Sequence, residues 1–225
     1  MGTAALLRAA GVGAGDEVVV SAFGNDDVAD EVTRAGALLA FADVDPLTYC
    51  LDPDAVRAAI TPRTAALVAV HRFGRPADVR RLCELGAGHG LLVLEQRESE
   101  APYDEVAQRR ERAAYLDARL RGVRTPEGGD GHSYQQYVVR VPGNGRPDRD
   151  AFARALRGRG IDCRVPVKTP LHRLPEFRRY VSLPQTELAA DETLTLPVDA
   201  SLTKRDMRRI VSACNALGGL LQPVF

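Results

Sequence analysis

Short apolar runs alternate with amphipathic stretches over the first hundred residues of the chain. The apolar runs lie at residues 17–21, 38–44, 65–71 and 91–95. Runs that are apolar almost throughout are typical of parallel strands covered on both faces. The stretches between them, at residues 2–10, 25–35, 52–61 and 77–87, have the apolar spacing and end signals of helices. This order predicts an α/β fold with a four-stranded parallel sheet and flanking helices.

Acidic residues near the predicted helices are assigned to caps and turns. Asp52 followed by Pro53 is typical of a helix start, and Asn25 or Asp26 would cap the preceding helix. We interpret Asp43 and Asp45 in the same way, as turn or cap residues rather than as metal ligands.

The pattern changes after residue 102. A charged helix is predicted at 103–121, a glycine-rich linker at 125–131 and a strand at 132–141. A helix at 149–159, a strand at 161–165 and a final helix that Thr203 caps, with Asp206 in the capping-box position, would follow. We therefore expect a large domain at 1–102, a linking helix at 103–124 and a small α+β domain at 125–225.

Charge and cysteine usage narrow the class of protein. Thirty basic residues balance thirty acidic residues, which argues against a general nucleic-acid binder. Cys50, Cys83, Cys163 and Cys214 are widely spaced, so buried thiols in a reducing compartment are expected rather than a zinc site. No apolar run has the length of a membrane span, and the first residues do not resemble a signal peptide. We expect a cytoplasmic protein that binds neither membrane nor nucleic acid.

Several segments of the chain form a distinctive series. In the first half these are GTAALLRAAGVGAGDEVVVSAF, the long string from GALLAFADVDP to GRPADV, and HGLLVLE. In the second half they are YVVRV, RALRGRGIDCRV, TPLHRLPEF and ETLTLPVDASLTKRDMRRIV. These segments resemble the DegT/StrS-type sugar aminotransferases, which are fold-type-I enzymes that use pyridoxal phosphate. The resemblance covers nearly the whole chain in the family's order. It implies a reduced form of the pyridoxal-phosphate transferase fold, with the small α+β domain at its C-terminal end.

The chain departs from the family at the residues that hold the cofactor. Gln96 stands where the resemblance implies an aspartate that pairs with the pyridine nitrogen and makes the ring an electron sink. Asn25 stands where an aromatic residue stacks on that ring. The stretch that carries the catalytic lysine is absent between Pro102 and Tyr103, and so is the family's segment before Gly2. We therefore predict no catalytic residue and no pyridoxal phosphate.

The two lysines of the chain are Lys168 and Lys204. A Schiff-base lysine needs a lowered pKa, which comes from burial or a neighbouring positive charge. Lys204 lies in the first turn of an amphipathic helix and should be solvated. Lys168 lies in a loop that, by the resemblance, faces the substrate; it is either a ligand-pocket residue or a plain surface lysine.

Other candidate site residues lie at a helix start and at strand ends. Gly2 and Thr3 match the phosphate-binding turn of the family and are candidates for a remnant anion site. His71, Glu95 and Gln96 end neighbouring strands and could converge in a remnant polar pocket, and His172 lies in the P-L-H motif. The alternative is that both histidines anchor loops. No P-loop, catalytic triad or metal triad is recognisable.

Together these features predict a pseudoenzyme with a regulatory or scaffold role through protein–protein interaction. The Arg- and Ala-rich composition is typical of a GC-rich genome such as that of an actinomycete, where development or secondary metabolism would be the process. One alternative is an accessory subunit that completes the active site of a full-length relative. Another is a sensor of a small metabolite in the remnant cleft. The strand at 91–95 would be a sheet edge, covered by the helix at 103–121, by a second copy in a homodimer or by another protein.

Overall fold

The computed structural model describes residues 2–24, 26–97, 103–129, 131–142, 149–199 and 201–218. Their contacts group them into two compact units. Unit 1 comprises Met1–Arg72, Pro76–Glu98 and Thr169–Glu187, and unit 2 comprises Phe73–Arg75, Ser99–Lys168 and Leu188–Phe225. Segment Thr169–Glu187 thus packs with the first half of the chain. The three-part division expected from the sequence stays a prediction.

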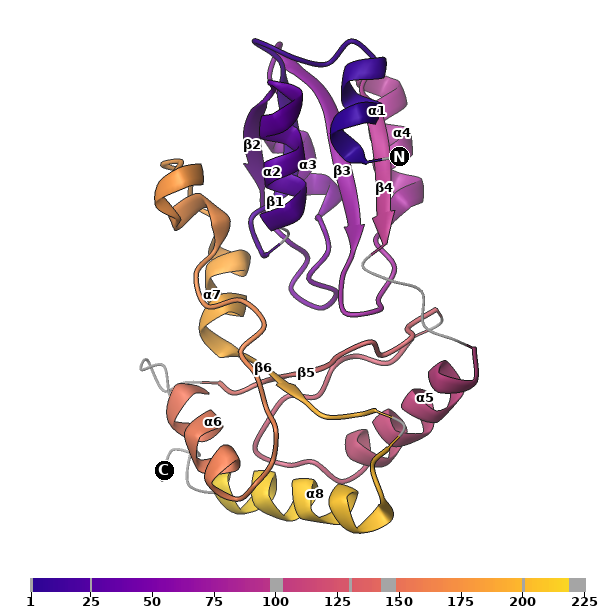
Figure 1. Ribbon diagram of the computed structural model, residues 1–225, viewed down its shortest axis with the longest axis vertical. Coiled ribbons are helices and arrows are strands. Elements are labelled where there is room, and N and C mark those ends of the chain that lie inside the picture. Colours follow the sequence, from indigo (N-terminus) through magenta and orange to yellow (C-terminus); the bar gives the residue numbers. More distant parts are fainter. Residues whose placement is uncertain are drawn as a thin grey trace. The chain divides into compact units, whose positions relative to one another are not determined.

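Unit 1 is built on a four-stranded parallel sheet. Its strands are β1 (Glu17–Ser21), β2 (Leu38–Ala42), β3 (Thr64–His71) and β4 (Leu92–Arg97), in the order β2-β1-β3-β4. All four predicted strands are present, and the predicted fold class is confirmed (Figure 1). β4 lies at the edge of this sheet, as expected.

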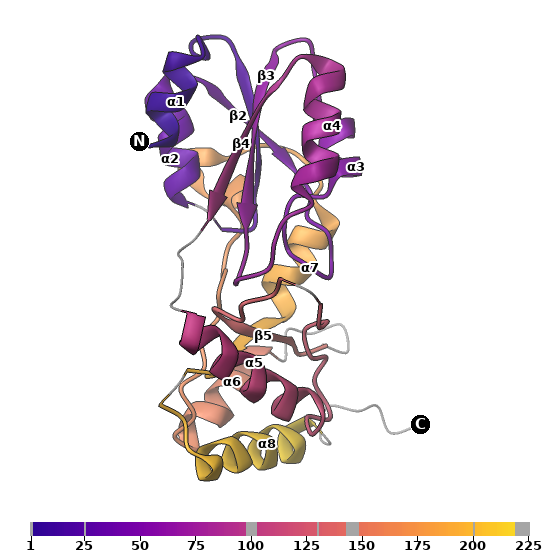
Figure 2. The ribbon, with the colours of Figure 1, turned by 90° about the vertical axis from the view of Figure 1, so that its right-hand side faces the viewer.

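Helices cover both faces of the sheet (Figure 2). On one face, α1 (Thr3–Ala9) and α2 (Asp26–Ala35) bury residues such as Leu7 and Val32 against alternate positions of the strands. On the other face, α3 (Pro53–Ala59) and α4 (Val79–His89) bury Val56 and Leu82 against the intervening positions. Both apolar faces of the strands are used, which explains why the strands are apolar almost throughout.

Glycine allows α4 to approach the edge strand closely. A Cβ added at Gly86 would lie 2.4 Å from Cγ2 of Val93 and 3.3 Å from the carbonyl oxygen of Leu91. Gly88, two residues further along the same helix, has no heavy atom within 4 Å of its added Cβ. The close contact of α4 with β4 therefore requires glycine at position 86, whereas position 88 has room for a side chain.

Carboxylates cap the helices as the sequence predicts, with one long-range addition. Asp52 accepts a hydrogen bond from the backbone N–H of Asp54 at the start of α3. Asp43 accepts hydrogen bonds from the N–H groups of Gln185 (2.9 Å) and Thr186 (2.7 Å). These are first-turn donors of α7 (Pro184–Glu192), a helix that the sequence analysis did not predict. The cap of this helix therefore comes from a residue 142 positions earlier in the chain and not from a local N-cap.

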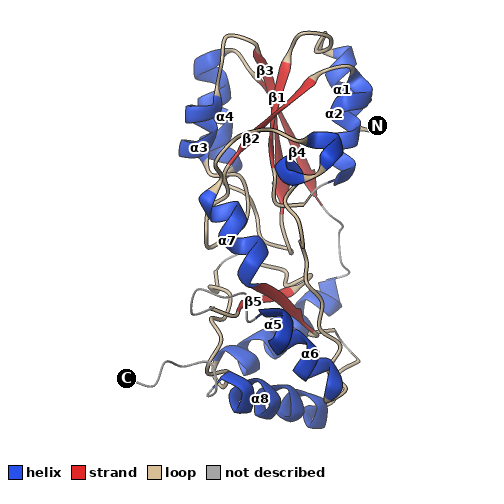
Figure 3. Cartoon of the chain, turned by 90° about the vertical axis from the view of Figure 1, so that its left-hand side faces the viewer, coloured by secondary structure: helices blue, strands red, loops and turns tan. Residues whose placement is uncertain are grey.

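Unit 2 contains a small antiparallel sheet and three helices. β5 (Tyr137–Arg140) pairs with β6 (Thr193–Leu196). The helices α5 (Tyr103–Asp117), α6 (Arg149–Gly158) and α8 (Lys204–Gly218) gather beside this sheet (Figure 3). Buried residues of these helices and strands, such as Leu116, Leu156 and Ile210, share one apolar core. Thr203 and Asp206 form the predicted capping box of α8.

Some expectations for the second half were wrong. The predicted strand at 161–165 is reduced to one bridge between Arg164 and Thr195, and β6 was not predicted. The predicted strand at 132–141 starts only at Tyr137, because Tyr134 has a φ of 48°, which is incompatible with a strand. The predicted helix at 103–121 ends at Asp117.

The sequence predicted buried thiols. Cys50, Cys163 and Cys214 are buried as expected, but Cys83 is exposed.

Short 3₁₀ turns also escaped prediction. η1 (Leu171–Arg173) and η2 (Pro175–Phe177) lie in unit 1 and bury Leu171 and Phe177 against the sheet.

None of the helices in the described ranges has the length and apolar content required to cross a membrane.

Buried polar aromatic residues lie in the core of unit 2. The ring of His132 stacks on Tyr134 with a centroid distance of 3.9 Å, and the Tyr137 hydroxyl donates a hydrogen bond to Asp117 (2.5 Å). Burial, together with the positive charge of Arg75, lowers the pKa of His132 to about 4. Burial likewise raises the pKa of Asp117 and of Tyr137. His132 is therefore neutral at neutral pH and belongs to the core.

The close packing of α4 on β4 predicts opposite effects of two alanine substitutions. Gly86→Ala should destabilise the protein by about 1–3 kcal/mol, because the new methyl group overlaps Val93. Gly88→Ala, in the same helix, should stabilise it by about 0.5–1 kcal/mol, because the unfolded chain loses freedom and nothing clashes. Urea unfolding of the two variants measures both changes. Equal effects of the two substitutions would contradict the packing described.

Candidate functional site

The carboxyl ends of β3 and β4 bring His71 and Glu95 together. Nε2 of His71 lies 2.8 Å from Oε1 of Glu95. The backbone N–H of Ala77 donates to Nδ1 of the same ring at 2.9 Å. Because Nδ1 accepts, the proton of a neutral His71 ring is on Nε2 and is donated to Glu95. Both ring nitrogens of His71 are therefore engaged within unit 1.

Glu95 is held in its charged form. The hydrogen bond from His71 lowers the pKa of this carboxyl, desolvation opposes that effect, and Arg97 at 3.3 Å lowers it further. The side chain of Glu95 is 39% exposed, so this is a partly solvated cluster. The arrangement fixes the turn that follows β3 through the bond from Ala77, which supports the loop-anchoring interpretation of His71.

Gln96 lies on the opposite face of the sheet from that cluster. Neighbouring residues of a strand point to opposite faces, and Leu92 and Leu94 of β4 pack on the core under α1 and α2. Gln96 shares their face, and its Oε1 lies 3.4 Å from the hydroxyl of Thr3 at the start of α1. The expected convergence of His71, Glu95 and Gln96 is therefore wrong, since strand alternation separates Gln96 from the other two.

A carboxylate of α2 occupies the turn that was expected to bind phosphate. The backbone N–H of Ala4 donates to Oε2 of Glu31 at 2.7 Å. The same oxygen lies 2.9 Å from the position that a Cβ of Gly2 would take. Glu31 also pairs with Arg34 at 2.8 Å. Backbone N–H groups at a helix start favour an anion, and here an internal anion fills that role.

Glu31 was not recognised from the sequence. It lies 27 positions from Ala4 and follows three aspartates that have no such contact among the described residues, so no local pattern marks it. Asn25, the position of the expected stacking aromatic, lies outside the described residues.

His172 anchors the return segment of unit 1. Its side chain is 3% exposed, its Nε2 lies 3.2 Å from Oε1 of Glu187, and its ring meets Phe41 edge-on with a centroid distance of 6.4 Å. Glu187 also pairs with Arg173 at 2.8 Å. A buried ring packed on the sheet core is suited to fixing this segment, which supports the loop-anchoring alternative for His172.

Neither lysine has the environment of a Schiff-base residue. Lys168 is exposed and belongs to unit 2, and Lys204 is exposed in the first turn of α8. Burial, which would lower an amine pKa, is thus missing at both positions. Within the described ranges, no group of three or more His, Cys, Asp or Glu side chains is placed to hold a metal ion.

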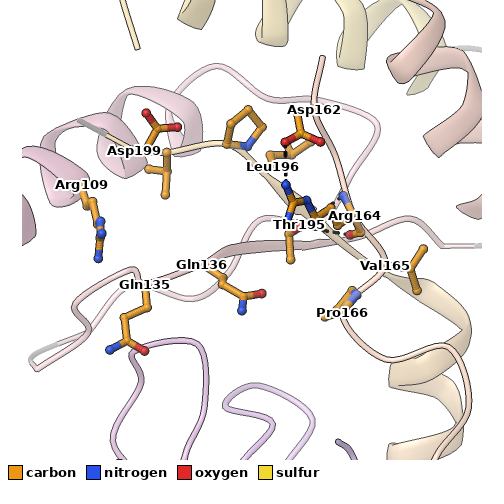
Figure 4. Close-up of a pocket in the computed structure, with 12 residues that line it drawn as sticks. Arg109, Gln135, Gln136, Asp162, Arg164, Val165, Pro166, Thr195, Leu196 and Asp199 are labelled. Carbon is orange, nitrogen blue, oxygen red and sulfur yellow. Dashed lines mark hydrogen bonds and ion pairs between the residues drawn. The ribbon is translucent and has the colours of Figure 1, made fainter. Parts of the chain in front are cut away.

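A polar pocket of about 450 Å³ lies in unit 2. Figure 4 shows Arg164 and Asp162 on one side of it and Arg109, Gln135 and Gln136 on the other. Arg164 pairs with Asp162 at 3.2 Å, and Arg109 pairs with Glu105 at 2.9 Å. Its apolar lining includes Val165, Pro166, Leu196, Pro197 and Val198. The sequence analysis missed this pocket, because its residues come from four separate segments.

The fold and these contacts define an aminotransferase-like protein in which Thr3 and Gln96, two of the positions singled out in the sequence, contact each other. The fold consists of a parallel sheet in the order β2-β1-β3-β4 and a small α+β unit. Thr3, Gln96 and Glu31 lie at the candidate site. The model of the DegT/DnrJ/EryC1/StrS aminotransferase family matches residues 1–97 and 103–215. The chain belongs to this family.

Relatives match over different lengths. A pleiotropic regulatory protein of Geobacillus stearothermophilus is 28% identical over 299 residues, covering 91% of this chain and 79% of the relative. The L-glutamine:2-deoxy-scyllo-inosose aminotransferase of Streptomyces kanamyceticus is 50% identical over 97 residues, covering 42% of this chain and 23% of the enzyme. The matched region thus spans less than a quarter of that enzyme.

Solved structures share the fold. The aminotransferase TlmJ from Streptoalloteichus hindustanus superposes with a TM-score of 0.85 at 24% identity, covering 97% of this chain and 84% of that one. 3-Amino-5-hydroxybenzoic acid synthase superposes with a TM-score of 0.85 at 20% identity, covering 96% of this chain and 84% of the enzyme. At this identity the likeness concerns the fold alone.

The bond between Glu31 and Ala4 predicts a stability effect at a site with no other role. Glu31→Ala should cost about 1–3 kcal/mol, because the buried N–H of Ala4 loses its acceptor. Glu31→Gln keeps an acceptor oxygen and should cost less. Asp30→Ala, at the neighbouring exposed position of α2, is the matched control and should change stability by less than about 0.5 kcal/mol. Urea unfolding compares the three variants; similar stability of Glu31→Ala and Asp30→Ala would contradict the assignment.

Proposed function

We propose that the chain is a non-catalytic member of its family that acts as a regulatory or scaffold protein through protein–protein interaction. One observation carries this proposal: positions that the family resemblance assigns to the cofactor, and the helix start beside them, have internal partners. Thr3 meets Gln96, and Glu31 holds the N–H of Ala4. A phosphate or a pyridine nitrogen would have to displace internal partners on that face of the sheet.

The residues present do not fit pyridoxal phosphate. Gln96 is neutral and cannot hold a pyridine nitrogen protonated as a carboxylate does. The carboxylate of Glu31 would repel a phosphate at the turn of Gly2 and Thr3, and its contact with Ala4 leaves that amide without room for an external anion. We therefore assign no reaction step to this cofactor.

The relatives support a regulatory role and a shortened chain. The relative from Geobacillus stearothermophilus is called a pleiotropic regulatory protein. Its alignment of 299 residues is longer than the 225 residues of this chain, so the relative has residues without a counterpart here. The family match is also interrupted between Arg97 and Tyr103, directly after β4. This is the place where the stretch with the catalytic lysine is expected to be absent. Several relatives are Streptomyces proteins, which fits a role in actinomycete metabolism.

The cofactor prediction can be tested by absorbance. Purified protein mixed with pyridoxal phosphate should show only the spectrum of the added compound, because Lys168 and Lys204 are both exposed to solvent and neither is buried as a Schiff-base lysine is. Borohydride treatment followed by peptide mass spectrometry should show no saturable adduct at either lysine. Lys168→Ala is the control variant. A saturable band that disappears in Lys168→Ala would falsify the non-catalytic assignment.

A metabolite sensor is the second candidate function, and the pocket in unit 2 is the observation that favours it. Its two arginines and its glutamine amides suit a phosphorylated or nucleotide-linked sugar, and Pro166 and Pro197 add apolar lining. Binding to the folded state would raise the melting temperature. A thermal-shift screen with UDP-glucose and glucose 6-phosphate should then give shifts that Arg164→Ala and Gln136→Ala reduce. Arg205→Ala on α8 serves as the control, and an absence of shifts with these compounds would remove this candidate.

A further inference from the structure

A short loop in the return segment of unit 1 exposes an aromatic ring almost completely. Residues 178–181, here named the Tyr180 loop, read Arg-Arg-Tyr-Val, and Tyr180 is 99% exposed. Tyr49, Tyr134 and Tyr137 are all less than 10% exposed. Val181 in the same loop is 37% exposed. No contact within the described residues explains why a tyrosine stands at this place.

The loop is held at both ends by buried residues. Phe177 before it is 8% exposed and Leu183 after it is 3% exposed, and both pack on the core under α1 and α2. The N–H of Arg179 donates to the carbonyl oxygen of His172 at 3.0 Å. His172 is itself fixed by Glu187 and Phe41. Beyond Leu183, Asp43 caps the start of α7. The contacts of His172 and Asp43 therefore anchor both ends of the Tyr180 loop.

The Tyr180 loop carries two positive charges that are exposed to solvent. Arg178 and Arg179 are exposed, and neither forms an ion pair with a carboxylate among the described residues. Arg173 nearby is already paired with Glu187, and exposed Glu176 limits the positive charge of the surroundings. The positive patch is therefore small and confined to the loop.

These features are those of a binding anchor. Tyrosine and arginine are the residues that most often dominate the energy of protein interfaces. A loop fixed before binding loses little conformational entropy when its partner arrives. A patch of two arginines with balanced surroundings is too small for nucleic acid, which needs an extended basic surface. The loop fits a protein surface that offers carboxylates beside an apolar recess.

We propose that the Tyr180 loop docks into an apolar recess on an acidic surface of a different protein. The ring of Tyr180 fills the recess, and Arg178 and Arg179 pair with carboxylates at its rim. This inference rests on the proposed function, since it names the surface and the partner chemistry through which a non-catalytic chain acts.

The experiment uses a displayed library of random peptides as the probe. Peptides are selected on the full chain and counter-selected on its Tyr180→Ala variant, and the enriched sequences are measured by fluorescence anisotropy. We expect a consensus of Asp or Glu around an apolar residue. Tyr180→Ala and the double variant Arg178→Ala/Arg179→Ala should each weaken binding at least tenfold. Added salt should weaken the binding of the wild type.

Matched controls separate binding from folding. Arg205→Ala/Arg208→Ala removes the same charge from exposed positions of α8 and should leave peptide affinity unchanged. Thermal unfolding of Tyr180→Ala should equal that of the wild type, because the removed ring has almost no contacts.

Three outcomes would overturn the proposal: no enriched peptide, a consensus without acidic residues, or equal binding by all variants. A consensus that matches residues 26–31 of this chain, where four of six residues are acidic, would make the partner a second copy instead. The result is independent of the cofactor test. A lysine adduct with pyridoxal phosphate would contradict the proposed function and leave the peptide measurement unchanged.

Discussion

Adjacent residues of a β-strand point to opposite faces of its sheet, and at the end of β4 this constraint decides what the site can be. Glu95 faces the side of α3 and α4 and bonds to His71, while Gln96 faces the side of α1 and meets Thr3. A pocket that needs both side chains at one place cannot form on this strand. Glu95 and Gln96 instead each bond to a partner on their own face of the sheet.

Internal partners occupy two helix starts of unit 1 that could have bound an anion. The start of α1 receives a carboxylate from Glu31, and the start of α7 receives one from Asp43. Both carboxylates satisfy N–H groups that would otherwise attract an anion. Such pairing stabilises the fold and at the same time closes the site. Other polar side chains line the pocket of unit 2, and those of the Tyr180 loop are exposed.

Local patterns in the sequence were sufficient for much of the fold. Four apolar runs separated by capped helices predicted the parallel sheet, and Asp52-Pro53 and Thr203 with Asp206 predicted two helix starts. The return segment was not predicted, because the cap of α7 comes from Asp43 and its partners are 142 and 143 positions away. β6 follows α7 directly without a turn signal, so its four residues could not be separated from the helix before it.

The candidate site was harder to predict for the same reason. Gln96 and Thr3 were each singled out from the sequence, but the contact between them joins positions 93 apart and was not predicted. Glu31 has no sequence signal at all. Long-range pairs of this kind depend on how α1 and α2 pack on the sheet, which a one-dimensional pattern does not contain.

Our central claim is that the chain acts without lysine chemistry. The most direct test deletes the gene in its own organism and compares messenger-RNA profiles after re-expression of the wild type or of Lys168→Ala/Lys204→Ala. Both lysines are exposed, so the double variant should fold and accumulate like the wild type. The account predicts that it restores the wild-type profile completely. Failure of an equally abundant double variant to restore the profile would contradict the claim.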